Sequence, residues 1–137
     1  MIGKIEYTTE RKFTQQQVEE LFLSIGWVSG RYPEHLFRAL QQSSYVLTAW
    51  DGERLVGLVR GMDDGCMTAF LHYLLVSPRY QHQGIASRLV EMSKDHYKTF
   101  FYLNVMPEES KNASFHERHG FRLMPDGVAM QVCNPDF

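Results

Sequence analysis

The sequence has few cysteines, no excess of charge of one sign and no long apolar run. Its two cysteines, Cys66 and Cys133, lie in apolar, strand-like surroundings and lack CxxC spacing, so we expect reduced, structural thiols and no disulfide framework. Fourteen Lys and Arg stand against sixteen Asp and Glu, without a basic block, which excludes a typical nucleic-acid partner. No apolar run approaches the roughly 20 residues of a membrane span, and the first residues resemble no signal peptide. We expect a cytoplasmic protein with no membrane partner.

The remaining composition is typical of one folded domain. Of 137 residues, 44% are hydrophobic and 22% are charged, which is enough apolar surface for a buried core. Glycine and proline occur singly, and neither a repeat nor a linker is visible. We therefore expect residues 1–137 to form a single domain.

The first half of the chain predicts one strand, two helices and a hairpin. Thr14 is a plausible N-cap of a helix that ends near Gly26, and Pro33 suits the first turn of a second helix. The Asp51-Gly52 dipeptide favours a tight turn between two apolar runs. The three strands predicted here are residues 2–7, 45–50 and 54–62.

The second half predicts a buried strand over residues 67–76, then a helix that carries Ile85, Leu89 and Met92. Further elements are a strand over 100–105, a helix over 112–119 ended by Gly120, and strands over 121–124 and 128–133 that pair across the Pro125-Asp126-Gly127 turn. The expected fold class is α/β (α+β), a mixed, mostly antiparallel sheet of roughly six to seven strands flanked by about four helices.

One segment favours the binding of an anion. Between Leu74 and Ser87 a buried strand passes into a helix through a turn that has small residues at Gly84 and Ala86. The N–H groups at the start of a helix, together with its dipole, attract phosphate, and small side chains let a ligand approach the backbone. Neither a GxGxxG fingerprint nor a P-loop is present, so these residues alone leave the anion undefined.

The pattern Gln81-x-x-Gly84-x-Ala86 resembles the coenzyme A pyrophosphate motif of the GCN5-related N-acetyltransferases (GNAT). A second similarity is the pair of segments 103–107 and 115–121, which resemble the closing strand and helix of that family. The resemblance implies acetyl-CoA as cosubstrate. Neither cysteine is placed like a nucleophile beside an orienting histidine, so we expect direct acetyl transfer without an acyl-enzyme. The resemblance also implies that backbone groups of Leu74, Leu75 and Val76 bind the pantetheine arm. The pyrophosphate would then be bound by Gln81, His82, Gln83, Gly84, Ile85, Ala86 and Ser87.

His72 is the candidate general base. Alkyl amines near pKa 10 arrive protonated, and histidine suits their deprotonation. The run from Leu71 to Val76 resembles that of arylalkylamine N-acetyltransferases, in which this histidine takes part in deprotonation. The alternative is a histidine that is hydrogen-bonded within a buried strand. Strand alternation predicts that Tyr73 points to the opposite face, into the core.

His116 is the candidate general acid. It occupies the position where the GNAT family usually has the tyrosine that protonates the departing thiolate. The alternative is a solvated helix residue. His116 and His119 are three residues apart, but no third ligand has recognisable spacing, so we predict no metal site.

The acceptor site is expected near Trp27 and Tyr32, because the family covers its acceptor cleft with this region. Aromatic side chains suit an apolar or aromatic primary amine of a small molecule, whereas Trp27 could equally pack at a helix end. Two other functions remain open: a non-catalytic acyl-CoA-binding sensor, and a protein or peptide N-acetyltransferase. A homodimer is compatible with the resemblance.

Overall fold

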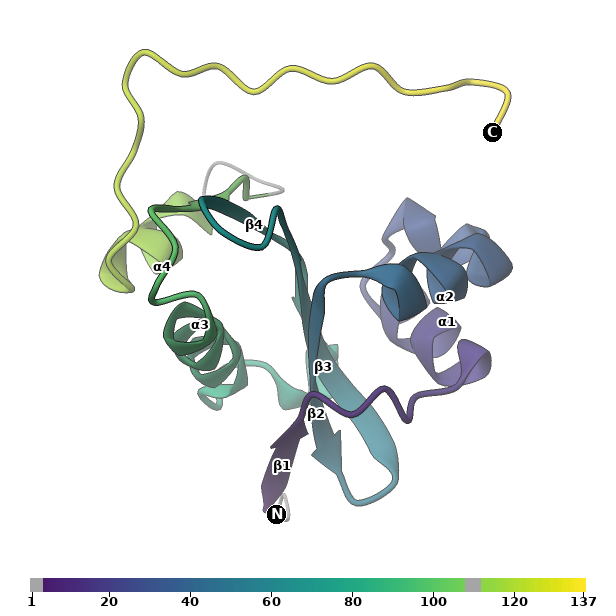
Figure 1. The fold of residues 1–137 in the computed structure, drawn as a ribbon. Helices are drawn as coiled ribbons and strands as arrows, with labels where there is room; N and C mark the ends of the chain where they lie inside the picture. Colours follow the sequence, from purple (N-terminus) through teal and green to yellow (C-terminus); the bar gives the residue numbers. More distant parts are fainter. Residues whose placement is uncertain (1–3, 108–111) are drawn as a thin grey trace. The chain divides into compact units, whose positions relative to one another are not determined.

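A five-stranded sheet organises the larger of two units in the chain, Met1–Val105, and the smaller unit is Met106–Phe137. The computed structural model describes residues 4–107 and 112–137. Neighbouring strands are antiparallel except for the last pair, β4 and β5, which is parallel. The strand order is β1 (Ile5–Thr8), β2 (Tyr45–Asp51), β3 (Arg54–Asp63), β4 (Thr68–Val76) and β5 (Tyr102–Val105) (Figure 1).

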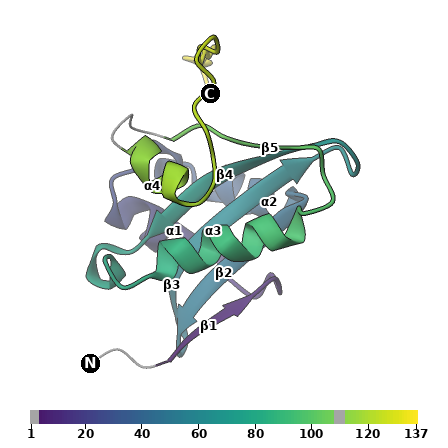
Figure 2. The ribbon, with the colours of Figure 1, turned by 90° about the vertical axis from the view of Figure 1, so that its left-hand side faces the viewer.

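Helices cover both faces of this sheet. Helices α1 (Gln15–Ser24) and α2 (Pro33–Gln42) lie on one face, and α3 (Ile85–His96) crosses the other (Figures 1 and 2). Between α1, α2 and the sheet, one cluster of buried apolar side chains forms the core, because each of these elements has one apolar face. This core consists of Phe13, Val18, Leu21, Phe22, Leu36, Leu40, Val46, Trp50, Leu55, Leu58 and Leu75.

The predicted start of α1 is confirmed. Thr14 Oγ1 accepts a hydrogen bond from the Gln17 N–H at 3.1 Å, and Gln17 Oε1 accepts from the Thr14 N–H at 2.9 Å. This reciprocal capping box satisfies two backbone donors. Pro33 begins α2, as predicted, and Asp51 and Arg54 pair across the expected hairpin.

Replacing Thr14 with alanine is expected to lower the free energy of unfolding by about 1 kcal/mol, because the N-terminus of α1 loses its side-chain acceptor. Urea unfolding would measure this change. The control is Thr99→Ala, at an exposed turn position, which is expected to change stability by less than about 0.5 kcal/mol. Equal effects of the two substitutions would contradict a role for the cap.

The connection from β4 through α3 to β5 forms the predicted strand–helix–strand unit. Hydrogen-bonded pairing between β4 and β5 runs from Thr68 to Leu71 and, within the described residues, stops there. The prediction of a β4 strand buried on both faces is therefore only partly right, since His72, Tyr73 and Leu74 are half-buried. This second half of β4 carries the candidate site.

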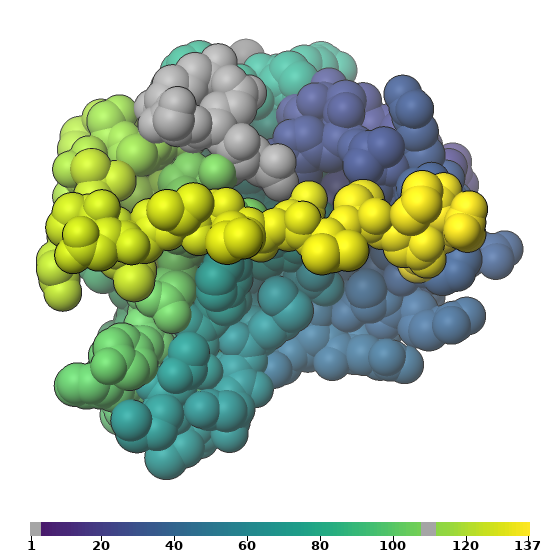
Figure 3. All heavy atoms as spheres, turned by 90° about the horizontal axis from the view of Figure 1, so that it is seen from above, coloured from purple at the N-terminus to yellow at the C-terminus, as the bar shows by residue number. Residues whose placement is uncertain are grey.

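The smaller unit contains α4 (Ala113–Arg118), which is followed by Gly120 at φ +89°, as the sequence predicted. The prediction of two strands over 121–124 and 128–133 is wrong, because residues 121–137 have no regular secondary structure. Figure 3 shows the last residues as an extended segment. The turn itself forms, because the Gly127 N–H donates to Met124 O at 3.0 Å. Alternation of apolar and polar residues was not enough to form these strands, since Val128 and Val132 are 82% and 100% exposed and pair with no strand of the described residues.

The described sheet thus has five strands, fewer than the roughly six to seven expected, and four α-helices accompany it in the described residues. Both cysteines are exposed, Cys66 beside the turn before β4 and Cys133 in the irregular segment, so neither lies in the apolar strand surroundings that we expected. Over residues 4–107 and 112–137, no helix is both long and apolar enough to cross a membrane. The single-domain organisation stays a prediction.

Candidate active site

A β-bulge interrupts the pairing of β4 with β3. Arg60 lies opposite His72, and Leu58 lies opposite Leu75, so two residues of β4, Tyr73 and Leu74, face one residue of β3. Tyr73 has φ +56°, a left-handed conformation that costs a tyrosine roughly 1–3 kcal/mol and that concentrates at functional sites. The bulge therefore marks the middle of β4 as a candidate site.

The bulge overturns the prediction that Tyr73 points to the face opposite His72, although Tyr73 does pack against the core, as predicted. Its ring stacks on that of His72, with ring centroids 4.0 Å apart and an angle of 29° between the planes, so the two side chains do not point to opposite faces. The Tyr73 hydroxyl is 2.8 Å from Ser29 Oγ, and its ring lies 6.3 Å from the Trp27 ring. We call Trp27, Ser29, Arg60, His72 and Tyr73 the bulge cluster.

Arg60 fixes the state of His72. Its Nε and Nη2 atoms lie 3.1 and 2.8 Å from His72 Nδ1, and a guanidinium can only donate, so Nδ1 is the acceptor and carries no proton. Burial, and secondarily the charge of Arg60, lower the pKa of His72 from 6.5 to about 4. His72 is therefore neutral near pH 7.

The lowered pKa predicts a loss of stability in mild acid. Between pH 6.5 and about 4 the unfolded chain binds a proton at His72 that the folded chain does not, so the free energy of unfolding falls as the pH falls. His72 contributes at most about 1.4 kcal/mol for each pH unit in this window. Urea unfolding of wild type and His72→Gln at about pH 7, 5.5 and 4.5 is expected to give a shallower pH dependence for the variant. Identical slopes would contradict the assignment.

Beyond the bulge, the side of β4 that faces away from β3 pairs with no other strand of the described residues. The Ser77 N–H donates to Val56 O at 2.8 Å, across to β3, so the preceding residue, Val76, directs its own N–H and C=O away from β3. Gln81 Nε2 donates to Val76 O at 3.0 Å and so ties the following loop to the end of the strand. An extended ligand could pair along this edge from Leu74 to Val76.

The loop after β4 forms a cradle at the start of α3. His82 and Gly84 both have positive φ, +63° and +88°, and Gly84 is the N-cap residue of the 12-residue helix. The first helical hydrogen bond runs from the Arg88 N–H to Gly84 O, so the N–H groups of Ile85 and Ala86 lie ahead of it. A Cβ added at Gly84 would meet nothing within 4 Å, so the space beside this N-cap residue is open. Such a helix start fits a diphosphate.

The two residues predicted for the acceptor lie on consecutive short elements. Trp27 is the N-cap of a 3-10 helix, Val28–Arg31, and Tyr32 is the N-cap of α2. Trp27 is half-buried and also packs against Phe22, with ring centroids 6.0 Å apart, whereas Tyr32 is 40% exposed. The structure thus brings Trp27 into the same cluster as His72.

His116 belongs to the smaller unit. It is 6% exposed, not solvated as the alternative supposed, and its Nδ1 has no hydrogen-bond partner among the described residues. Burial, and secondarily the charge of His119, lower the pKa of His116 below its ordinary value of 6.5. At neutral pH, a smaller fraction of His116 than of an ordinary histidine is therefore protonated. This weakens the case for His116 as a general acid. In the part of the chain that the structure describes, no group of three His, Cys, Asp or Glu could hold a metal ion.

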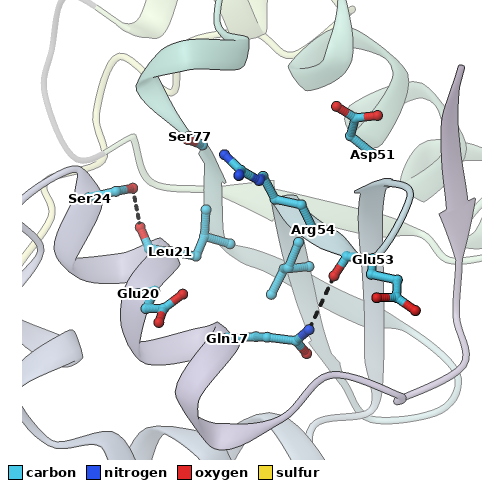
Figure 4. Close-up of a pocket in the computed structure, with 9 residues that line it drawn as sticks. Gln17, Glu20, Leu21, Ser24, Asp51, Glu53, Arg54 and Ser77 are labelled. Atoms are coloured by element: carbon cyan, nitrogen blue, oxygen red, sulfur yellow. Dashed lines mark hydrogen bonds between the residues drawn. The ribbon is translucent and has the colours of Figure 1, made fainter. Parts of the chain in front are cut away.

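A hollow of about 620 Å³ lies on the α1 side of the sheet (Figure 4). Arg54 extends toward Ser77, the first residue after β4, while Gln17 Nε2 donates to Glu53 O at 3.3 Å. This hollow is lined by no member of the bulge cluster and by neither Trp27 nor Tyr32. Its lining consists of Gln17, Glu20, Leu21, Ser24, Asp51, Glu53, Arg54, Leu55 and Ser77.

Sequence reasoning missed Arg60 and Ser29. The sequence did contain a signal for Arg60: it interrupts the apolar run of β3, and a charged residue in such a run rarely lacks a partner. Ser29 has no comparable signature.

Comparison with known proteins gives a consistent result. The profile of the acetyltransferase (GNAT) family matches residues 11–121. A solved GNAT-family acetyltransferase from Streptococcus pneumoniae is 30% identical, with a TM-score of 0.82 over 96% of this chain and 99% of that one. A protein from Deinococcus radiodurans, 22% identical with a TM-score of 0.83 over 99% and 95% of the two chains, shares the fold. No match was found among curated proteins.

Proposed function

Because the chain belongs to the acetyltransferase (GNAT) family, we propose that it transfers an acetyl group from acetyl-CoA directly to a primary amine of a small molecule. The observation that carries this proposal is that three features follow one another along the chain: the bulge at Tyr73, the edge of β4 up to Val76 that pairs with no further described strand, and the helix start at Gly84. These three features, in this order, support the binding of a long thioester ligand.

Coenzyme binding would use backbone groups more than side chains. The diphosphate would accept hydrogen bonds from N–H groups between Gln81 and Ser87, and the open space at Gly84 supports a close approach. The pantetheine arm would pair with the edge from Leu74 to Val76. This placement brings the thioester toward the bulge cluster.

The chemistry is a balanced acyl transfer. The amine nitrogen bonds to the carbonyl carbon, the C–S bond breaks, and the proton lost by nitrogen ends on the sulfur of the released thiol. His72 is the proposed catalytic residue of the larger unit. His116, with its orphaned Nδ1, stays a prediction as the proton donor. Neither cysteine has an orienting histidine beside it in the described contacts, which supports transfer without a covalent acyl-enzyme.

The aromatic pair Trp27 and Tyr32 supports an apolar or aromatic amine as acceptor. The ring of Trp27 lies next to that of Tyr73, which supports a single site formed by the 3-10 helix region and the bulge. The cytoplasmic location and the homodimer stay predictions.

The test is thiol release from acetyl-CoA in the presence of a panel of aromatic and aliphatic amines, together with peptides that carry free amino termini or lysines. We expect release with apolar small amines above the rate of spontaneous hydrolysis. Saturable acetyl-CoA binding without release for any acceptor would favour the sensor alternative. Release with peptides alone would favour a protein N-acetyltransferase.

A further inference from the structure

The guanidinium of Arg60 is half-buried and has no carboxylate partner among residues 4–107 and 112–137. Within the described residues, the ion pairs within 4.0 Å involve Lys94 and Lys98, on or just after α3, and none reaches Arg60. The groups that contact the guanidinium among the described residues are uncharged: the Nδ1 atom of His72, Ser43 Oγ at 3.4 Å, and the Tyr73 ring, whose centroid lies 4.4 Å from the central carbon of the guanidinium. Burying a charge without a counter-charge costs free energy, so a functional reason for the position of Arg60 is expected.

We propose that Arg60 is a positioning residue that holds His72 in the tautomer with its proton on Nε2, so that His72 serves acetyl transfer as a hydrogen-bond donor and not as the general base. Both hydrogen bonds from Arg60 occupy the only lone pair that a neutral imidazole in this state offers. A general base would have to accept the amine's proton at that occupied atom. The catalytic part of this inference rests on the proposed function, whereas the tautomer is a property of the free protein.

The surroundings of His72 reinforce this state. From β3 it faces the Arg60 cation, and beside it on β4 lies the Tyr73 ring, which is held at its hydroxyl by Ser29 from the 3-10 helix. No carboxylate of residues 4–107 or 112–137 forms an ion pair with His72. The environment therefore opposes an imidazolium, which a base must become during the reaction.

In the reaction, the Nε2–H group would donate to the thioester carbonyl oxygen as negative charge develops there, and His72 would keep its proton throughout. The proton that leaves the amine would pass to water or to the thiolate. A donor of this kind typically contributes about 10²- to 10³-fold to turnover.

The first test reads the tautomer by two-bond ¹H–¹⁵N correlation of the imidazoles, with His72 assigned from the spectrum of His72→Gln. Wild type is expected to show the Nε2–H pattern at neutral pH and to resist protonation down to about pH 5. In Arg60→Met the protonation midpoint is expected to move toward the ordinary value near 6.5, whereas Arg38→Met, at an exposed position on α2, leaves it unchanged. A Nδ1–H pattern in wild type would overturn the proposal even if Arg60→Met failed to fold.

The second test compares His72→Gln with His72→Leu in the acetyl-transfer assay. Glutamine can donate a hydrogen bond but is no useful base, so turnover is expected within about tenfold of wild type, against a loss of about 10²-fold or more in His72→Leu. Equal losses of about 10²- to 10⁴-fold in both variants would indicate a general base and overturn the proposal. If wild type itself releases no thiol, the proposed function fails, and the tautomer is still decided by the first test.

Discussion

Replacing Gly84 with valine is expected to abolish measurable binding of coenzyme A while the fold persists. The added side chain would project into the open space in front of the α3 N-terminus, where the diphosphate is proposed to lie. Calorimetric titration is expected to show at least a 100-fold loss of affinity, since several charge-assisted hydrogen bonds are blocked together. The left-handed backbone, at φ +88°, adds roughly 1–2 kcal/mol of strain.

The chain offers a matched control for that strain. Gly65 has φ +80°, and a Cβ added there also meets nothing within 4 Å, but it lies in the turn before β4 and away from the cradle. Gly65→Val is therefore expected to lose similar stability and no affinity for coenzyme A. Equal losses of affinity in the two variants would indicate general destabilisation instead of a blocked site.

The second large effect is expected at His72. His72→Ala is expected to lower kcat about 10²-fold and to leave the affinity for coenzyme A nearly unchanged, because the ring lies beside the bulge and the contacts proposed for the coenzyme are backbone groups. Steady-state kinetics and calorimetry on the same preparation separate these quantities. Removing the ring also leaves the half-buried Arg60 without its acceptor, so unfolding must be measured in parallel.

Ser44→Ala is a suitable comparison for that experiment. Ser44 is exposed, and its Oγ accepts a hydrogen bond from the Asp63 N–H, outside the bulge cluster. We expect kcat of this variant to stay close to wild type. A joint loss of turnover and coenzyme affinity in His72→Ala would instead mark His72 as a structural residue.

Local sequence chemistry predicted most elements because they are specified locally. The capping box at Thr14, the proline at the start of α2 and Gly120 after α4 are each decided within a few residues. The helical spacing of apolar residues and the apolar run of β4 predicted the strand–helix–strand crossover within the sheet. Gly84, predicted to lie in the turn before a helix, is the N-cap residue of α3 with φ +88°, whereas anion binding there stays a prediction.

The bulge could not be predicted, since it depends on how β3 and β4 pair across the sheet. One extra residue between Leu75 and His72 reverses the expected side of Tyr73 and brings it onto the His72 ring. Arg60 was missed for the same reason, because its partner is 12 residues away in sequence. The predicted strands at the carboxyl end fail because an alternating segment becomes a strand only where a partner edge accepts it.

The most direct test of coenzyme binding at the β4–α3 junction is amide NMR of the ¹⁵N-labelled chain on addition of coenzyme A or pantetheine. Coenzyme A is expected to shift the amide signals of Ile85 and Ala86 as well as those near Val76. Pantetheine, which lacks the diphosphate, is expected to shift only the signals of the strand edge. Shifts that cluster elsewhere, or none in the α3 cradle with saturating coenzyme A, would contradict the account.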